Sequence, residues 1–145
     1  LYASNFSIGV NLFFALNHFL ARLMDGQPQY DAAIKEVHHT QKLDAPSGTA
    51  ITLAELIVEA LKRKDRWAKG ATGPAAAVPI ESERSGDVPG THEVQYRSAI
   101  DTITLRHDAH SREGFARGAL QAAEWIVGKT GFFTMSDVLG LKEER

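Results

Sequence analysis

The sequence predicts an α+β fold in which a mixed sheet of about four strands carries helices on one of its faces. Apolar residues recur with helical spacing in residues 7–24, 49–64 and 112–127. Strand-type composition, with period-two alternation, marks residues 30–38, 78–84, 92–97 and 100–107. One helix follows the first strand and the other strands lie close together in the chain, an order that favours a mixed sheet with helices on one side.

The first predicted helix is apolar over most of its circumference. Its apolar run at residues 8–20 is interrupted by polar residues such as Asn17 and His18 and is too short to span a bilayer, so a buried helix is predicted. His18 is expected to have a structural role. The turn sequence DGQP at residues 25–28 ends this helix, and the first strand follows.

A break in the chain and a second helix come after the first strand. Pro46 restricts the residue before it and cannot continue a helix or a central strand, so residues 44–46 mark the break. Ser47 or Thr49 then supplies the N-cap oxygen of the helix. The apolar stripe of this helix consists of Leu53, Ala54, Ile57 and Leu61.

The region after the second helix contains a loop and three strands. Residues 65–74 include Gly70, Gly73 and Pro74 and are interpreted as an exposed loop. The pair Ser98-Ala99 is expected to connect the last two strands tightly. The apolar strand residues line either the internal core or an intersubunit face, and the sequence leaves both open. These residues are Val78, Ile80, Val94 and Tyr96.

The last predicted helix has an apolar face and a glycine-rich end. Gly128 and Gly131 close it. Its apolar face consists of Phe115, Ala119, Leu120, Ala123 and Ile126.

Length and composition limit the class of protein. The chain has 145 residues, of which 43% are hydrophobic, enough for one domain with a real core. Its formal net charge of −2 gives no sign of a nucleic-acid or membrane surface. The sequence has no cysteine, which excludes disulfides and zinc–thiolate sites. This composition leaves the redox compartment open but fits the cytoplasm.

The segment EVHHTQKLDAPSGTA, residues 36–50, places two histidines and a lysine just before the second helix. The first amides of that helix, its dipole and a glycine that lets a ligand approach the backbone form a site for carboxylate or phosphate. Lys42 adds a mobile positive charge. His38 and His39 suit proton transfer near neutral pH, and because adjacent strand residues point to opposite faces we expect them to divide roles.

Each of these residues also has a structural interpretation. One histidine would be a packed strand residue, Lys42 a solvated charge, and residues 47–49 only a helix cap. For any single residue that interpretation is favoured, whereas the combination favours a catalytic anion-binding loop. His92, His107 and His110 lack metal-ligand spacing, so no metal site is predicted and structural or intersubunit roles are expected.

Residues 38–50, HHTQKLDAPSGTA, resemble the substrate loop of the 4-hydroxy-tetrahydrodipicolinate reductase family, also called dihydrodipicolinate reductases, with the pattern HHxxKxDAPSGTA. Three more segments agree with the family in order. Residues 3–11, ASNFSIGVN, resemble ANFSxGVN. Residues 84–92, RSGDVPGTH, resemble RxGDxxGxH, and residues 107–118, HDAHSREGFARG, resemble HxAxSRxxFAxG. The resemblance covers nearly the whole chain.

This resemblance implies reduction of a small dicarboxylate, 4-hydroxy-tetrahydrodipicolinate, to tetrahydrodipicolinate with NADH or NADPH, in cytoplasmic lysine and diaminopimelate biosynthesis. His38 would be the general acid–base group, and Lys42 a proton donor that also pairs with a carboxylate. The residues that would hold the substrate are His39, Ser47, Gly48 and Thr49. Those that would contact the cofactor are Ala3, Ser4, Asn5, Phe6, Arg112 and Phe115.

Spacing alone favours other roles for two of these cofactor residues. Arg112 would form a surface ion pair with Glu113 or Asp108, and Phe115 would be a core residue of the last helix. The resemblance to the family instead implies that both residues contact the cofactor.

The domain organisation is predicted from a missing motif. No GxGxxG follows a strand here, although nicotinamide enzymes normally carry that phosphate-binding sequence. The resembling family has it near the N-terminus, so the chain is expected to be the C-terminal part of a longer protein and inactive alone. Residues 1–110 would bind substrate and oligomerise, with residues 1–10 at the junction with the dinucleotide domain. Residues 111–145 would form a helix and tail packed back toward that domain.

The family further implies a homotetramer assembled through the sheet face that the helices leave open. Pro89 and a short segment at residues 65–77 depart from the family pattern, and neither is expected to touch the chemistry. A non-catalytic dicarboxylate-binding oligomerisation domain is the alternative function. It predicts binding that does not depend on proton donation by His38.

Overall fold

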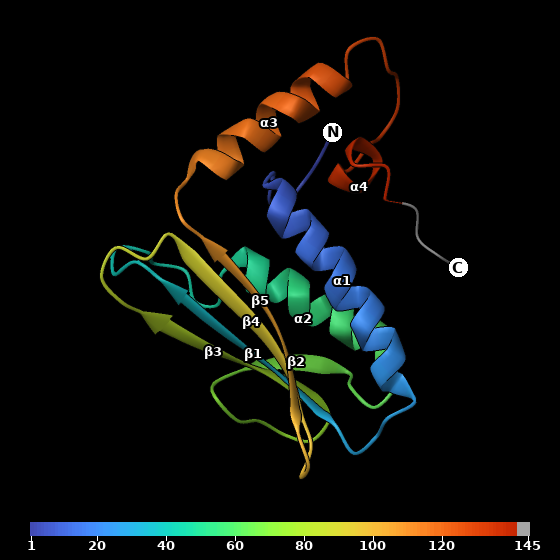
Figure 1. Ribbon diagram of the computed structural model, residues 1–145, viewed down its shortest axis with the longest axis vertical. Coiled ribbons are helices and arrows are strands. Elements are labelled where there is room, and N and C mark those ends of the chain that lie inside the picture. The colour runs from blue at the N-terminus through green and yellow to red at the C-terminus, as the bar shows by residue number, and fades with distance from the viewer. Residues whose placement is uncertain (142–145) are drawn as a thin grey trace.

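The computed structural model describes residues 1–141, which form a mixed sheet of five strands in the order β2-β3-β1-β4-β5 (Figure 1). Strand β1 is parallel to β3 and antiparallel to β4, β2 is parallel to β3, and β5 is antiparallel to β4. In chain order the elements are α1 (Ile8–Asp25), β1 (Asp31–His38), α2 (Gly48–Ala60), β2 (Arg66–Lys69), β3 (Ala77–Arg84), β4 (Gly90–Arg97), β5 (Thr102–Ala109), α3 (Glu113–Trp125) and α4 (Met135–Val138).

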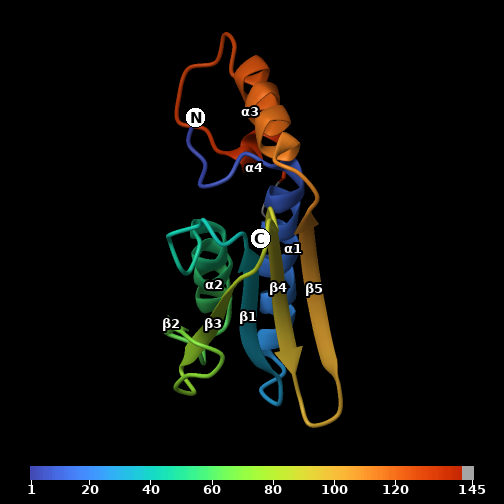
Figure 2. The ribbon, with the colours of Figure 1, turned by 90° about the vertical axis from the view of Figure 1, so that its left-hand side faces the viewer.

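Helices α1 and α2 pack against one face of the sheet, and the α+β prediction is confirmed (Figure 2). Alternate residues of β1 and β4 point into the core beneath the helices. The two helices are joined by packing and by Asn17, whose buried amide donates to the carbonyl of Leu53 at 3.0 Å. The strand residues that the sequence left undecided belong to this internal core. They are Val78, Ile80, Val94 and Tyr96, all buried.

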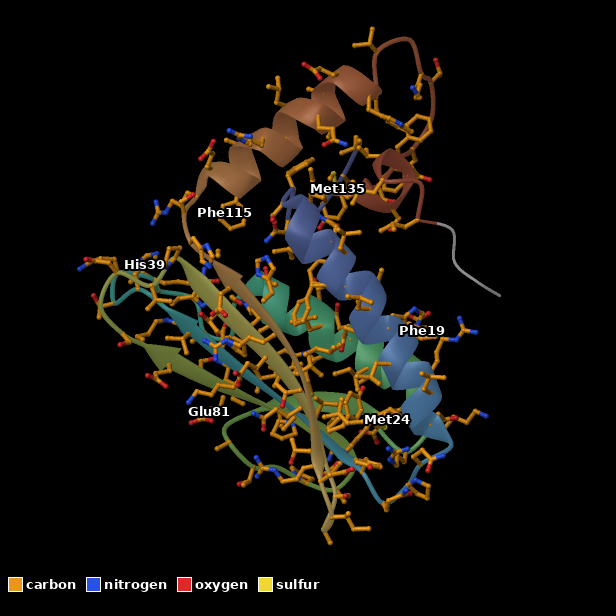
Figure 3. The ribbon with its side chains drawn as sticks, in the orientation of Figure 1. Phe19, Met24, His39, Glu81, Phe115 and Met135 are labelled. Atoms are coloured by element: carbon orange, nitrogen blue, oxygen red, sulfur yellow. The ribbon has the colours of Figure 1, made fainter. Side chains whose placement is uncertain are left out.

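Helix α1 is buried on one side only, so the prediction of a buried helix is half right. Its inner side contributes Val10, Phe13, Asn17, Ala21 and Met24 to the interior. Its outer side leaves Leu12, Leu16, Leu23 and Phe19 exposed, the last labelled in Figure 3.

The opposite face of the sheet is charged, and within residues 1–141 no helix covers it. Lys35 on β1 pairs with Glu83 on β3 at 3.1 Å. Arg106 on β5 pairs with Glu93 on β4 and with its own neighbour Asp108, both at 2.7 Å. Cross-strand ion pairs of this kind keep polar side chains ordered on a surface that the chain itself does not bury.

Strand β2 corrects the prediction of a loop at residues 65–74. Residues 66–69 pair in parallel with β3, and half-buried Trp67 packs against the core. Four residues are too few to show an alternating pattern, so the neighbouring glycines and proline dominated the sequence signal. Helix α2 ends at Ala60, earlier than predicted, because Leu61 is extended and turns the chain toward β2.

Helix α3 corrects a predicted face. Gly118 and Ala122 are its buried residues, while Ala119, Leu120 and Ala123 are exposed. The helix leans away from the sheet and lies beside the N-terminal segment and α4, which was not predicted (Figure 1). A second apolar cluster forms there from Ala122, Met135 and Val138, with Ala3, Phe6, Trp125 and Leu139 packed against it.

None of the helices within residues 1–141 is both long enough and apolar enough to cross a bilayer.

Lys64 is a buried lysine that joins three segments. Its ammonium donates to the carbonyls of Ala75 and Ala77 at 2.7 and 3.0 Å and pairs with Asp31 at 2.6 Å. Replacing it with methionine leaves those carbonyls without a donor, so we expect Lys64→Met to lower the free energy of unfolding by about 2–3 kcal/mol in urea titrations. Lys62→Met, at an exposed position, is the matched control and should change it by less than about 0.5 kcal/mol. If the two variants lowered the free energy of unfolding equally, Lys64 would not be the buried link between the three segments.

Gly118 allows α3 to cross the N-terminal segment closely. A β-carbon at this position would lie 1.7 Å from the carbonyl oxygen of Phe6, which is impossible without displacing backbone. We expect Gly118→Ala to destabilise the packing of α3 by about 1–3 kcal/mol, measured by amide hydrogen exchange within α3. Gly114→Ala in the same helix is the control, because its β-carbon would meet only the Ser7 hydroxyl at 3.6 Å. Unchanged exchange in Gly118→Ala would show that the crossing tolerates a methyl group.

Candidate active site

The end of β1 and the start of α2 carry the sequence motif. His38 is the last residue of β1, and Ser47 caps α2 by accepting a hydrogen bond from the amide of Ala50 at 3.2 Å. The Ser47 amide donates in turn to the buried carboxylate of Glu36 at 2.9 Å. The helix therefore starts where predicted, and its first amides open toward the loop.

A cavity of about 570 Å³ lies between this loop, the N-terminal segment and the start of α3. In Figure 3, Phe115 at the start of α3 lies above His39, which follows β1. The cavity is lined by Ser4, Asn5, Phe6, His38, His39, Lys42, Asp44, Ser47, Gly48, Thr49, Pro89, Arg112 and Phe115. Every predicted site residue except Ala3 is in this lining, while Ala3 packs against the second apolar cluster.

Two residues of the lining were not predicted. Pro89 borders the cavity, and the expectation that it does not touch the chemistry stays a prediction. Asp44 pairs with Lys42, whose ammonium lies 2.8 Å from the carboxylate, and this contact holds the pKa of Asp44 below its usual value. The lysine charge is thus held in place by a neighbour within the same loop.

Positive groups and hydrogen-bond donors surround the cavity. A guanidinium nitrogen of Arg112 lies 3.3 Å from Nε2 of His39, which joins the start of α3 to the loop after β1. Together with Lys42 and the amides at the start of α2, these groups suit a ligand with more than one carboxylate.

The N-terminal segment is tied to the same loop. The side-chain nitrogen of Asn5 donates to the hydroxyl of Thr49 at 3.2 Å. The side-chain oxygen of Asn5 accepts from the backbone amide of Ser7 at 2.8 Å. The side chain of Asn11 in turn donates to the carbonyl of Asn5 at 2.8 Å. These bonds fix the Asn5 and Phe6 side of the cavity relative to α2.

Sequence reasoning missed Glu36, which is fully buried beneath the cavity. In the sheet it lies directly opposite Ser82 on β3 and His92 on β4. Its Oε1 accepts from the Ser47 amide and from the Ser82 hydroxyl at 2.8 Å, and lies 3.5 Å from Arg84. A charged residue two positions before His38 shares its face of the strand, and this spacing was the available signal.

The other oxygen of Glu36 faces two histidines. Oε2 lies 3.2 Å from Nδ1 of His38 and 3.6 Å from Nε2 of His92. Burial alone raises the pKa of Glu36, but the nearby rings of His38 and His92 and hydrogen bonds from Ser47 and Ser82 together hold the pKa well below its usual range. The carboxylate is therefore ionised at neutral pH, while burial lowers the pKa of His92 and favours its neutral form.

Donor atoms of Glu36, His38 and His92 lie within 4.8 Å of one another, a spacing that a metal ion can bridge, and no other such group is found in residues 1–141. Sequence reasoning considered His92 together with His107 and His110, and not with Glu36 and His38. His107 packs against Phe13, with ring centroids 6.0 Å apart, and His110 is exposed. The prediction that the protein uses no metal stays a prediction.

Comparisons with known proteins agree with the motif. A family model described as "Dihydrodipicolinate reductase, C-terminus" matches residues 9–139. The chain is 52% identical over 139 residues to the 4-hydroxy-tetrahydrodipicolinate reductase of Christiangramia forsetii, covering 96% of this chain and 58% of that protein. It is 44% identical to the enzyme of the same name from Aquifex aeolicus, covering 97% of this chain and 54% of that one.

A solved structure is also similar. Dipicolinate-bound dihydrodipicolinate reductase from Paenisporosarcina sp. TG-14 superposes with a TM-score of 0.62 at 28% identity, covering 84% of this chain and 47% of that chain. The chain thus spans about half the length of the relatives it matches. By the family match and by its identity to these relatives, the chain belongs to the dihydrodipicolinate reductase family, in the part that the family model describes as the C-terminus.

Proposed function

We propose that this chain supplies the substrate site and the acid–base groups for reduction of 4-hydroxy-tetrahydrodipicolinate to tetrahydrodipicolinate, a step of lysine and diaminopimelate biosynthesis. The observation that carries the proposal is one cavity lined by both histidines, the lysine, the start of α2 and the aromatic and basic residues of the N-terminal segment and α3. The names of the relatives support the same reaction.

The substrate carboxylates would be held from two sides. The start of α2 offers the amides of Gly48 and Thr49, and its dipole favours an anion there. Lys42 offers a charge-assisted hydrogen bond, for which a substrate carboxylate competes with Asp44. Dipicolinate, which is bound to the solved relative, is a flat dicarboxylate and fits this division.

Proton transfer falls to His38 and Lys42. Conversion of 4-hydroxy-tetrahydrodipicolinate to tetrahydrodipicolinate takes up one hydride and one proton overall and releases the 4-hydroxyl group as water, so proton donors are needed beside the substrate. Both side chains line the cavity. His38 is nearly buried, so its ring is held in one orientation beside the substrate, whereas Lys42 is partly exposed and paired with Asp44. We assign the general acid–base role to His38 and the second proton donor to Lys42.

The cofactor side would be formed by Ser4, Asn5, Phe6, Arg112 and Phe115. Two aromatic rings and a guanidinium suit the nicotinamide end of NADH or NADPH, which supplies the hydride when bound. Ala3 would act indirectly, by anchoring the segment in the second cluster. The rest of the cofactor would be bound by a dinucleotide domain in the intact protein.

We further propose that residues 1–110 bind substrate and assemble, and that the helix and tail of residues 111–145 contact the dinucleotide domain; residues 142–145 lie outside the described part. The charged outer face of the sheet would form the contact in a cytoplasmic homotetramer. A hollow of about 810 Å³ on that face, bordered by residues 71–74, by the start of β1 and by the end of β4, offers space for a second copy.

Dicarboxylate binding is tested by isothermal titration calorimetry with pyridine-2,6-dicarboxylate. We expect saturable heat, and we expect Lys42→Ala to weaken binding by about tenfold or more because a charge-assisted hydrogen bond of about 1.5–3 kcal/mol is lost. Lys62→Ala, at an exposed position just after α2, is the matched control and should bind like the parent chain. Equal affinity in the two variants would remove Lys42 from the substrate site.

Turnover in the intact protein that contains this chain tests the role of His38. We expect His38→Gln to lower kcat by about 10²- to 10⁴-fold, since general acid–base catalysis contributes that much, while pyridine-2,6-dicarboxylate still binds. His110→Gln, at an exposed position, is the control for the same side-chain change. If His38→Gln kept normal turnover, or if the parent protein bound the dicarboxylate without reducing the substrate, a non-catalytic binding domain would be the better description.

A further inference from the structure

Glu36 is the one charged group beneath the candidate site, among the described residues, that contacts the catalytic histidine without lining the cavity. We propose that Glu36 is a positioning residue that holds His38 as the tautomer protonated on Nδ1 and at the same time anchors the start of α2 through the Ser47 amide. The inference rests on the proposed function of His38 as the acid–base group.

The hydrogen-bonding capacity of a carboxylate decides the tautomer. An ionised carboxylate only accepts hydrogen bonds, and Oε2 of Glu36 lies 3.2 Å from Nδ1 of His38. Within residues 1–141 both atoms are buried and neither meets hydrogen-bond geometry with any group, so each is the polar atom nearest at hand for the other. The proton of a neutral His38 ring therefore belongs on Nδ1. Nε2 is then the nitrogen that gains and loses a proton during the reaction.

The surroundings of the ring hold it in one place. A β-carbon on Gly90 would lie 3.2 Å from Nε2 of His38, so the glycine leaves room beside this nitrogen. The ring of His92 meets His38 nearly edge-on, with centroids 5.0 Å apart. Oε2 of Glu36 lies beside the Nδ1 edge of the ring, so close neighbours on several sides limit rotation of the imidazole.

The carboxylate of Glu36 also contacts groups next to the proposed substrate-binding residues. Its Oε1 accepts from the Ser47 amide at 2.9 Å, one residue before the helix start that would hold a substrate carboxylate. Arg84, 3.5 Å from Oε1, donates to the carbonyls of Lys42 and Asp44 at 3.3 and 2.5 Å. One buried charge is thus connected to the histidine, to the helix start and to the lysine loop.

Replacing Glu36 with glutamine tests its role in orienting His38 without changing the volume of the side chain. The Ser47 amide and the Ser82 hydroxyl need an acceptor, so the glutamine oxygen takes the place of Oε1. Its NH₂ group then faces Nδ1 of His38, which must become an acceptor. Glu36→Gln keeps the volume and the anchor of α2 but moves the proton of the ring to Nε2.

The tautomer is read directly from ring ¹⁵N chemical shifts of the intact protein labelled with [¹⁵N]histidine, with the His38 signals identified by their loss in His38→Gln. We expect Nδ1–H in the parent protein and Nε2–H in Glu36→Gln. Nε2–H in the parent protein would overturn the inference. So would Nδ1 signals that change on adding a chelator, because a metal ion would then occupy the cluster.

Kinetics provide the second readout. We expect Glu36→Gln to lower kcat by about 10- to 100-fold, as for other groups that orient a histidine, with KM changed by less than about threefold. Glu59→Gln, the same change at an exposed position of α2, is the matched control and should leave both parameters unchanged. An unchanged kcat in Glu36→Gln would overturn the inference. A lower kcat with reduced thermal stability but an unchanged tautomer would also overturn it, because that combination marks a structural role.

The experiments distinguish failure of the proposed reaction from failure of the proposed role of Glu36. If Glu36→Gln does not fold, the tautomer of the parent protein alone decides. If the parent protein does not reduce the substrate, the proposed reaction fails, whereas the ¹⁵N shifts still confirm or overturn the link between Glu36 and His38.

Discussion

The buried carboxylate of Glu36 is the interaction on which the site depends. A charge removed from water costs several kcal/mol unless donors surround it, and here they come from segments far apart in the chain. Ser82 lies beside it on one neighbouring strand and His92 on the other, because β1 is central among the paired strands. The register of β1 with both neighbours is therefore coupled to the start of α2 through the Ser47 amide.

The sheet separates this interior from a charged outer surface. Successive residues of β1 alternate between the two, so Glu36 is fully buried while Lys35 forms an exposed ion pair. The inner face is apolar beneath the helices along most of its length and polar only near the end of β1. The site thus lies at the edge of the core, where a cluster of fixed donors and acceptors is shielded from water and still borders a cavity.

Two packed units meet at that cavity. The sheet with α1 and α2 forms the main core, and α3, α4 and the N-terminal segment form the second cluster. The residues proposed for proton transfer and anion binding belong to the first unit, whereas Phe6, Arg112 and Phe115 come from the second. Gly118 sets how closely the second unit packs, and the bond from Asn5 to Thr49 ties it to the first.

The sequence by itself determined the elements with long periodic patterns, a helix capped by Ser47 or Thr49, and the loop motif that carries His38, His39 and Lys42. Those features depend on local spacing and on backbone chemistry, which neighbouring residues decide. The tertiary structure alone decided that β2 is a strand, that α3 buries Gly118 and Ala122, and that Lys42 is paired. It also decided that Glu36 lies beneath the site. Each of these depends on segments distant in the chain and on which side chains share a buried space, which no local pattern contains.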